Sequence, residues 1–314
     1  MSETVAADYQ LLIIGGGPAG LTAGLYAARA RLRALLLEKG AMGGQVLVTD
    51  WVDNYPGFTD GISGFDLMDK MTAHATRFGL ESRIATVTSM DLTGPVKRIL
   101  LENGETLTTR AVILCTGARP NPLGIPGERE LIGKGVSYCA TCDAPFYRGQ
   151  EIAVVGGGNT AVQEAIHLTK FASKVTLIHR RGELRAAKIL QEKAFANEKL
   201  EIRWSTRVTA IEGGANGVER LQLVSTVDGS QSTLAVTGIF VLIGVMPNNE
   251  MLPLDQLPTD DYGFVKTDAE MRTPLPGVMA AGDIRSKNVR QIVNAAGEGA
   301  VAVLSVEEYL AGLA

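Results

Sequence analysis

The stretch Leu11-Leu12-Ile13-Ile14-Gly15-Gly16-Gly17-Pro18-Ala19-Gly20 decides the fold of the first part of this chain. Its four apolar residues predict a buried strand, and the alanine-rich residues after the glycines predict a helix. Glycines at such a turn let phosphate groups approach the unpaired backbone N–H groups at the positive end of the helix. The stretch therefore predicts a Rossmann-like dinucleotide-binding domain with Gly15, Gly17, Pro18, Ala19 and Gly20 at the phosphates.

The same arrangement occurs again after the apolar run Ile152 to Val155, where the turn reads Gly156-Gly157-Gly158-Asn159-Thr160-Ala161. In both copies a second apolar strand follows, and its last residue lies 23 positions after the first glycine, at Glu38 and at His179. One unit is thus used twice. We expect an α/β protein with two Rossmann-like domains of the three-layer ββα kind, the second inserted into the first. The residues predicted at the second set of phosphates are Gly156, Gly158, Asn159, Thr160 and Ala161.

Each copy closes with an apolar strand that ends in Gly-x-x-Pro, at Pro120 and at Pro247. Proline and glycine end strands, so these points are the natural crossings between domains. The remaining segment contains a predicted strand over 278–283 and a predicted helix over 289–310, too little for a core of its own. We therefore expect a first domain over 1–117 and 248–314 and a second domain over 118–247.

Composition excludes several classes of function. The 314 residues carry a net charge of −4 and no basic block, so nucleic acid and anionic membranes are not expected partners. The uncharged run 11–28 is interrupted by three glycines and a proline and is preceded by acidic residues, unlike a membrane span or an export signal. We expect a cytoplasmic protein.

The residues that end the second strand of each copy differ in charge. The carboxylate of Glu38 can accept hydrogen bonds from ribose hydroxyls and repels a 2′-phosphate, which favours FAD in the first domain. At the same offset the second copy has His179, Arg180 and Arg181, with Arg185 expected one helical turn on. Guanidinium groups pair with phosphate, which favours NADPH. The alternative is a solvated basic strand end.

Cys139-Ala140-Thr141-Cys142 lies between the two glycine turns, and Asp143 follows it. A Cys-x-x-Cys motif can be half of a metal site, a buried pair or a redox dithiol. The other Cys and His residues do not have the paired spacing of a zinc site, so no metal is expected. Two cysteines beside a predicted helical turn that would stabilise a thiolate favour redox exchange.

The neighbours of the dithiol allow further expectations. Asp143 can exchange a proton with the thiolate, and a surface or capping role is the alternative. Cys115 lies in an apolar strand and is expected in the core. His74 and His167 have no partner at a suggestive spacing and are expected to be structural.

Together these motifs resemble the low-molecular-weight thioredoxin reductases of the class II pyridine nucleotide-disulfide oxidoreductases, from about Tyr9 to Leu310. Gly43-Gly44-Gln45, Gly282-Asp283 and Arg290-Gln291 also match. The resemblance implies a homodimer with FAD in the first domain, NADPH in the second and thioredoxin as partner. It places Cys142 toward the flavin and leaves open which sulfur attacks the partner.

The resemblance also implies cofactor contacts by position. Gln45 and Asn54 would lie in the flavin region, Asp283 at the ribityl chain, and Arg290 with Gln291 at the isoalloxazine ring. The further residues carried over as cofactor-binding are Lys39, Gly44, Gly117, Gly282 and Ile292.

Several functional alternatives share these motifs. The acceptor can be a glutaredoxin-like protein or a peroxidase, and the donor can be NADH. Oxidation of a small dithiol by oxygen and electron supply by ferredoxin are disfavoured by the arginine cluster, and a flavin-binding protein without catalysis is a further rival. Because the dithiol and the nicotinamide belong to one domain and both must approach the flavin, we expect that domain to rotate about the two crossings.

Overall fold

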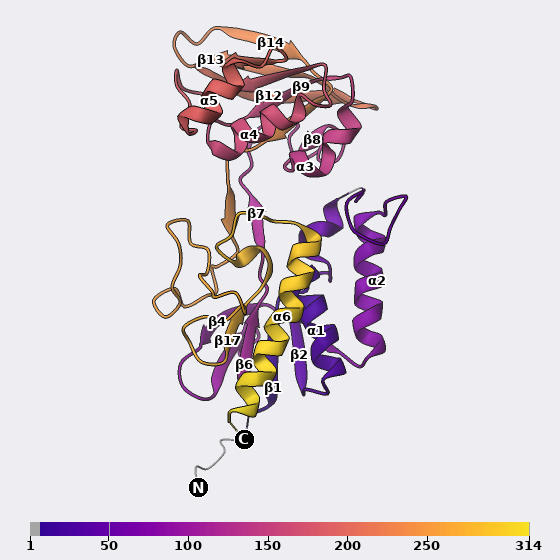
Figure 1. Cartoon of the computed structure of the whole chain (residues 1–314), viewed down its shortest axis with the longest axis vertical. Coiled ribbons are helices and arrows are strands. Elements are labelled where there is room, and N and C mark those ends of the chain that lie inside the picture. The colour runs from indigo at the N-terminus through magenta and orange to yellow at the C-terminus, as the bar shows by residue number, and fades with distance from the viewer. Residues whose placement is uncertain (1–6, 50, 314) are drawn as a thin grey trace. The chain divides into compact units, whose positions relative to one another are not determined.

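The computed structural model describes residues 7–49 and 51–313. The chain divides into two compact units (Figure 1). Unit 1 comprises Met1–Arg119 and Met246–Ala314, and unit 2 comprises Pro120–Val245. Each boundary between the units lies two residues from the expected position. Both boundaries fall within the strands that connect the units. β7 (Ala118–Pro120) and β16 (Val245–Pro247) form a two-stranded sheet.

Unit 1 contains a seven-stranded sheet with the order β3-β2-β1-β6-β5-β4, in which β17 also pairs with β6. Strands β3, β2, β1, β6 and β17 are parallel, whereas β4 and β5 are antiparallel additions. The strands are β1 (Tyr9–Ile14), β2 (Ala34–Glu38), β3 (Glu81–Ile84), β4 (Val87–Asp91), β5 (Lys97–Leu101), β6 (Thr106–Leu114) and β17 (Val278–Ala280). The helices are α1 (Pro18–Arg29), α2 (Gly64–Arg77) and α6 (Ile292–Ala311), with short 3-10 turns η1 (Gly44–Val48) and η3 (Gly282–Ile284).

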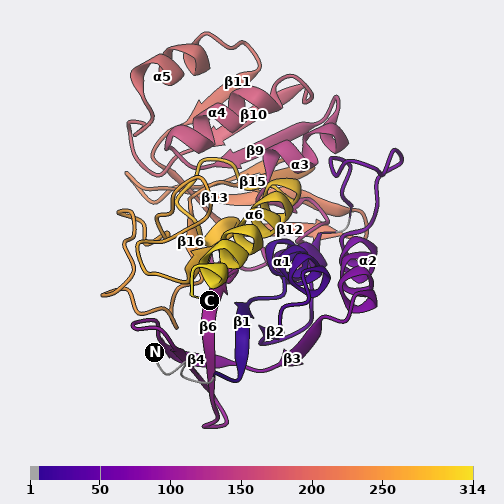
Figure 2. The ribbon, with the colours of Figure 1, turned by 60° about the horizontal axis from the view of Figure 1, so that its bottom comes forward.

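The sheet of unit 1 is buried on both faces. Leu11 and Ile13 of β1 point into a core shared with the helices, which Figure 2 shows on one side of the sheet. Leu12 and Ile14 point into a second core shared with β4, β5 and the segment before β17. Alternate residues of a strand face opposite sides, so an uninterrupted apolar strand is what a three-layer arrangement needs.

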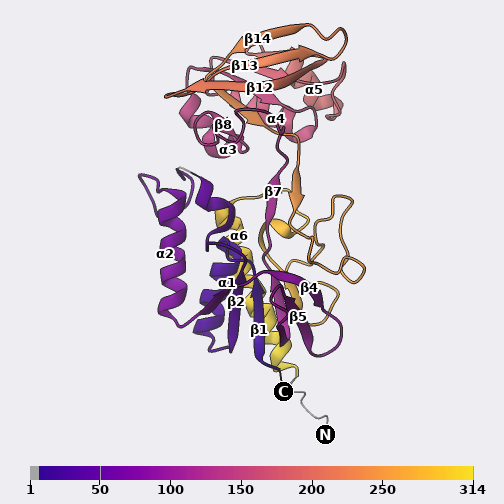
Figure 3. The ribbon, with the colours of Figure 1, turned by 180° about the vertical axis from the view of Figure 1, so that it is seen from behind.

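Unit 2 repeats this plan. Its five-stranded parallel sheet has the order β11-β10-β9-β15-β8, with helices on one face and the three-stranded antiparallel sheet β12-β13-β14 on the other (Figure 3). The strands are β8 (Val136–Ser137), β9 (Glu151–Val155), β10 (Lys174–Ile178), β11 (Leu200–Arg203), β12 (Thr206–Gly214), β13 (Gly217–Ser225), β14 (Gln231–Ala235) and β15 (Gly238–Val241). The helices are α3 (Ala140–Asp143), α4 (Asn159–Leu168) and α5 (Lys188–Phe195), and the 3-10 turn η2 spans Ala144–Tyr147.

The first residue of each turn must be glycine, because another part of the backbone lies too close for a side chain. A Cβ on Gly15, whose φ is +109°, would lie 2.3 Å from the carbonyl oxygen of Cys115. A Cβ on Gly156 would lie 2.6 Å from the carbonyl oxygen of Leu242. In each unit the turn therefore passes directly beside the residue that follows the neighbouring parallel strand, and only glycine fits.

The last helix begins later than the sequence predicts. α6 starts at Ile292 rather than near Val289, because Gln291 is its extended N-cap. Arg290 stays outside the helix, where its guanidinium donates to the carbonyl of Lys287 and lies 4.1 Å from the Phe264 ring centre. None of the helices in the described part of the chain combines the length and apolar character that a membrane crossing requires.

Candidate functional site

The glycine turn of unit 1 leaves room for a bound group. A Cβ on Gly17 would meet no described atom within 4 Å, and α1 starts at Pro18 with no side-chain cap on its N-terminus. The first N–H groups of such a helix have no intrahelical acceptor, so the turn presents donors and a positive dipole end to an anion. Gly44 lies beside this turn, since its Cβ would be 3.3 Å from the Cα of Gly17.

Glu38 lies against the same turn. Its carboxylate accepts hydrogen bonds from the Gly16 N–H at 2.7 Å and from the Gly40 N–H at 3.1 Å. These contacts fix the carboxylate at the end of β2 while each oxygen retains a further acceptor position. Lys39, the next residue, is exposed. The fold therefore brings together the glycines and the carboxylate predicted to bind FAD.

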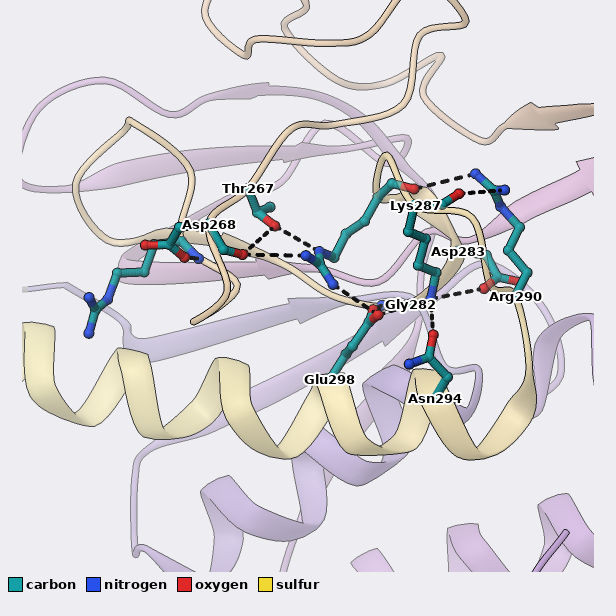
Figure 4. A network of polar contacts seen from close by, with 10 residues as sticks. Thr267, Asp268, Gly282, Asp283, Lys287, Arg290, Asn294 and Glu298 are labelled. Carbon is teal, nitrogen blue, oxygen red and sulfur yellow. Dashed lines mark hydrogen bonds and ion pairs between the residues drawn. The ribbon is translucent and has the colours of Figure 1, made fainter.

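The turn at Gly282 and Asp283 lies within unit 1, close to the start of α6 (Figure 4). Burial raises the pKa of Asp283 above its ordinary value, and the charge of Lys287 opposes that shift. Lys287 Nζ lies 3.3 Å from Asp283 Oδ1 as an ion pair, yet this buried oxygen accepts no hydrogen bond from the described residues. The buried Nε of Arg290 also lacks a described partner. Buried polar atoms without a hydrogen-bond partner are unfavourable, so both are suited to contact a ligand.

Asn54 and Gln291 are far apart in sequence and adjacent in the fold. The side-chain amide of Asn54 donates to Gln291 Oε1 at 3.1 Å. Gln45 lies in η1 and Ile292 is the first residue of α6. Gly117 has a φ of +71° and accepts a hydrogen bond from the Asn248 N–H at the start of the crossing. The roles of these residues toward a flavin stay predictions.

The glycine turn of unit 2 has the same open character. A Cβ on Gly158 would meet no described atom within 4 Å, and α4 has no side-chain cap. Asn159 is occupied structurally, because its Oδ1 accepts a hydrogen bond from the Ala187 N–H at 2.8 Å. Thr160 and Ala161 follow in the first turn of α4, and Ala161 is fully buried.

The basic residues after β10 do not form one surface cluster. Arg180, Arg181 and Arg185 are exposed, but His179 is buried with 6% of its surface accessible. Its ring packs on Gly157, where a Cβ would lie 2.2 Å from His179 Cε1. Burial lowers the pKa of His179, which favours the neutral ring. The positive charge at this edge therefore comes from the arginines.

The position of Arg185 also differs from expectation. It was expected one helical turn after the other arginines, but α5 begins only at Lys188. Residues 180–187 form a loop, and the Arg185 N–H donates to the Gly157 carbonyl at 2.8 Å. The amide of Gln191 supports this loop by donating to the Ala186 carbonyl at 2.7 Å. The backbone of Arg185 is thus bound to the glycine turn itself.

Cys139 and Cys142 form a disulfide across the short helix α3. Cys139 is the N-cap, and its sulfur accepts a hydrogen bond from the Cys142 N–H at 3.2 Å. Both cysteines are partly exposed. A donor at the positive end of a helical turn stabilises a thiolate on Cys139 once the disulfide opens.

Asp143 ends α3, and its N–H donates to the Cys139 carbonyl at 3.2 Å. Burial and then the charge of Asp143 raise the pKa of Tyr147 to about 12, so its hydroxyl stays protonated. Ala140 of α3 and Ala144 of η2 pack into the core that contains α4. The disulfide and the second glycine turn therefore belong to one unit.

The remaining cysteine is buried, and the remaining two histidines contact aromatic rings. Cys115 is buried, and burial raises the pKa of its thiol. His74 packs on Phe78, and His167 packs on Phe171. Within the described residues, no group of His, Cys, Asp and Glu side chains is arranged to hold a metal ion.

Comparison with known proteins assigns the family. The family described as pyridine nucleotide-disulphide oxidoreductase matches residues 9–299. The chain is 46% identical over 302 residues to a thioredoxin reductase of Listeria monocytogenes, covering 96% of this chain and 94% of the relative. It is 44% identical over 303 residues to that of Bacillus subtilis, covering 96% and 95%. The crystal structure of thioredoxin reductase from Streptococcus pyogenes matches with 44% identity and a TM-score of 0.92, covering 97% and 98%.

The chain belongs to the thioredoxin reductases of this family. The resemblance and the α/β fold expected from the sequence are confirmed. The chain is a flavoprotein oxidoreductase, and its Cys139–Cys142 disulfide is consistent with the redox-active centre. Membership implies FAD and a pyridine nucleotide as cofactors. The open glycine turns and the buried Asp283 Oδ1 and Arg290 Nε atoms, which have no hydrogen-bond partner among the described residues, fit such groups.

Sequence reasoning missed a network of buried ion pairs that contacts Asp283 through Lys287. Glu298, Lys287 and Arg285 form it together. One signal was available, because Glu298 interrupts the small apolar residues on the buried face of α6. A carboxylate in that position is rarely buried without a cationic partner.

Proposed function

We propose that the chain reduces thioredoxin with NADPH, by way of FAD bound to unit 1 and the Cys139–Cys142 disulfide of unit 2. The observation that carries this proposal is the disulfide itself, which spans a helical turn in the unit that also holds the arginine-flanked nucleotide turn. The names of the relatives support thioredoxin as the partner.

The choice of nucleotide follows from charge at the ends of β2 and β10. Glu38 lies beside the first turn and repels a 2′-phosphate, which suits FAD in unit 1. Arg185 is held beside the second turn, and Arg180 and Arg181 are exposed nearby in the chain. Guanidinium groups form charge-assisted hydrogen bonds with a 2′-phosphate and weaker ones with the neutral 2′-hydroxyl of NADH, so we assign NADPH to unit 2.

Bound FAD would supply two-electron transfer between the pyridine nucleotide and the disulfide. Two electrons break the Cys139–Cys142 bond, and two protons complete the thiols. Asp143, adjacent to Cys142, is the candidate to deliver a proton. A thiolate then attacks the disulfide of thioredoxin and forms a mixed disulfide, which the second thiol resolves. The net reaction converts NADPH, a proton and oxidised thioredoxin to NADP⁺ and the reduced dithiol protein.

This cycle requires movement of unit 2. The nicotinamide of its bound nucleotide and its dithiol must each approach the same flavin, and the dithiol must also reach thioredoxin. We propose that unit 2 rotates about the paired crossings β7 and β16 between the two half-reactions. Crosslinking the units should preserve one half-reaction and abolish the other.

We also propose a cytoplasmic homodimer. Large apolar side chains are exposed on α1, α2 and α6, among them Tyr26, Phe65 and Leu304. Such residues are more typical of an interface than of a solvated surface. Light scattering of the purified protein tests the dimer.

Anaerobic stopped-flow reduction tests the function. NADPH should bleach the flavin of the wild-type chain faster than NADH does, and oxidised thioredoxin should then restore the flavin absorbance. Cys142→Ser should retain flavin reduction and lose transfer to thioredoxin, whereas Cys115→Ala, which changes the buried cysteine, should retain both. Thioredoxin reduction by Cys142→Ser at the wild-type rate would overturn the proposal.

A further inference from the structure

Glu298 is a buried carboxylate on the packed face of α6. Only 7% of its surface is accessible, and the neighbouring buried residues of the helix are Ala295, Gly299 and Ala302. A lone charge in such surroundings is strongly unfavourable, so its partners must compensate for lost hydration.

The partners of Glu298 all come from the segment just before α6 (Figure 4). One oxygen accepts the Gly282 N–H at 2.7 Å. Arg285 Nη1 lies 2.8 Å from the other oxygen, and Lys287 Nζ lies 3.1 and 3.2 Å from the two oxygens. Both cationic side chains are nearly buried, with 12% and 10% of their surface accessible. Glu298 thus binds the backbone of the Gly282 turn and two cations at once.

Lys287 connects Glu298 to Asp283, because it forms an ion pair with each. The same ammonium that binds Glu298 lies 3.3 Å from Asp283 Oδ1 and donates to Asn294 Oδ1 at 3.1 Å. Arg285 anchors the other side, since its Nε donates to Thr267 Oγ1 at 2.7 Å. Asp283 therefore has its position set by Lys287, and Lys287 by Glu298.

The turn at Gly282 and Asp283 is short and has few internal hydrogen bonds. η3 is a three-residue 3-10 turn, and Gly282 has a φ of +79°. Its N–H is buried and would have no acceptor without Glu298. Loss of such a partner exposes the full penalty of an unpaired buried donor, and the turn can relieve it only by moving.

We propose that Glu298 and Lys287 are positioning residues for flavin binding, which hold the Gly282–Asp283 turn and aim the Asp283 carboxylate at the bound cofactor. This inference rests on the proposed binding of FAD to unit 1. Neither residue touches the cofactor; both act through Asp283.

A double-mutant cycle on the full-length chain tests this role. FAD affinity of the apoprotein is measured by fluorescence quenching for wild type, Lys287→Met, Asp283→Asn and the double variant. Methionine keeps the length of the stem and removes the charge. Glu298→Gln tests the second residue, and Glu308→Gln is the matched control, because Glu308 loses the same charge on the exposed face of α6. Thermal unfolding of each apoprotein and visible circular dichroism of the bound flavin accompany the titrations.

The role predicts coupling between Lys287 and Asp283. Lys287→Met should raise the FAD dissociation constant at least about tenfold in the wild-type background and less than about threefold in the Asp283→Asn background, since contacting residues are not additive. Glu298→Gln should weaken FAD binding and alter the circular dichroism of the flavin, and Glu308→Gln should do neither.

Two outcomes of the FAD titrations would contradict the positioning role. Equal loss of FAD affinity from Lys287→Met in both backgrounds, or no loss, would show that the network serves stability alone and overturn the inference. Failure of the wild-type chain to bind FAD would instead overturn the proposed function.

Discussion

Replacing Arg185 by glutamine tests its proposed contact with the 2′-phosphate separately from the rest of nucleotide binding. The backbone of this residue is held independently of its guanidinium, because its N–H donates to the Gly157 carbonyl and the flanking Ala186 carbonyl accepts from Gln191. Its side chain is exposed. The loop should therefore keep its shape, and the free energy of unfolding should change by less than about 0.5 kcal/mol.

The magnitude follows from the lost contact. A hydrogen bond to a charged group contributes about 1.5–3 kcal/mol, which corresponds to a change of about 10- to 150-fold in kcat/KM. Solvent at this exposed position places the expected loss near the lower end of that range. The loss should fall on NADPH alone, because NADH lacks the 2′-phosphate that we propose Arg185 binds.

The assay is steady-state reduction of thioredoxin with each nucleotide in turn. Arg185→Gln should lower kcat/KM for NADPH about tenfold or more and leave the value for NADH within about twofold. Arg207→Gln, which removes the same charge from an exposed position of β12, is the control and should change neither. An equal loss for both nucleotides would refute the assignment of Arg185 to the 2′-phosphate.

Two further expectations follow from burial and close packing. Alkylation should modify none of the three cysteines in the oxidised protein, two of them after reduction by NADPH, and all three only after unfolding. The reason is that burial raises the pKa of the Cys115 thiol and so disfavours its thiolate. Mass spectrometry that finds Cys115 modified in the folded protein would contradict this. Gly157→Ala should lower the free energy of unfolding, measured in urea, by about 1–3 kcal/mol, because the added methyl group collides with the His179 ring. This loss of stability should be smaller in a His179→Ala background. The same loss in both backgrounds would exclude the ring as its cause.

Local sequence was sufficient for the parts of this protein that depend on neighbouring residues. The strand, glycine turn and helix around Gly15 and Gly156 follow from steric and hydrogen-bonding rules that act within a few residues. The spacing of Cys139 and Cys142 likewise permits a disulfide without reference to the rest of the chain. The start of α6 was misplaced because contacts of Arg290 with Phe264 and the Lys287 carbonyl, not helix propensity, keep residues 289–291 outside the helix.

Tertiary structure alone decided which distant side chains share an environment. His179 and Arg180 are adjacent in sequence, yet one is buried against Gly157 and the other is exposed, because the end of β10 turns only one of them inward. Asn54 meets Gln291 across 237 positions, and Glu298 meets the Gly282 N–H across 16. The sequence thus determined the two nucleotide turns and the dithiol, whose geometry is local. Packing determined the charges around Asp283, since ion pairs form between side chains that only the folded chain brings together.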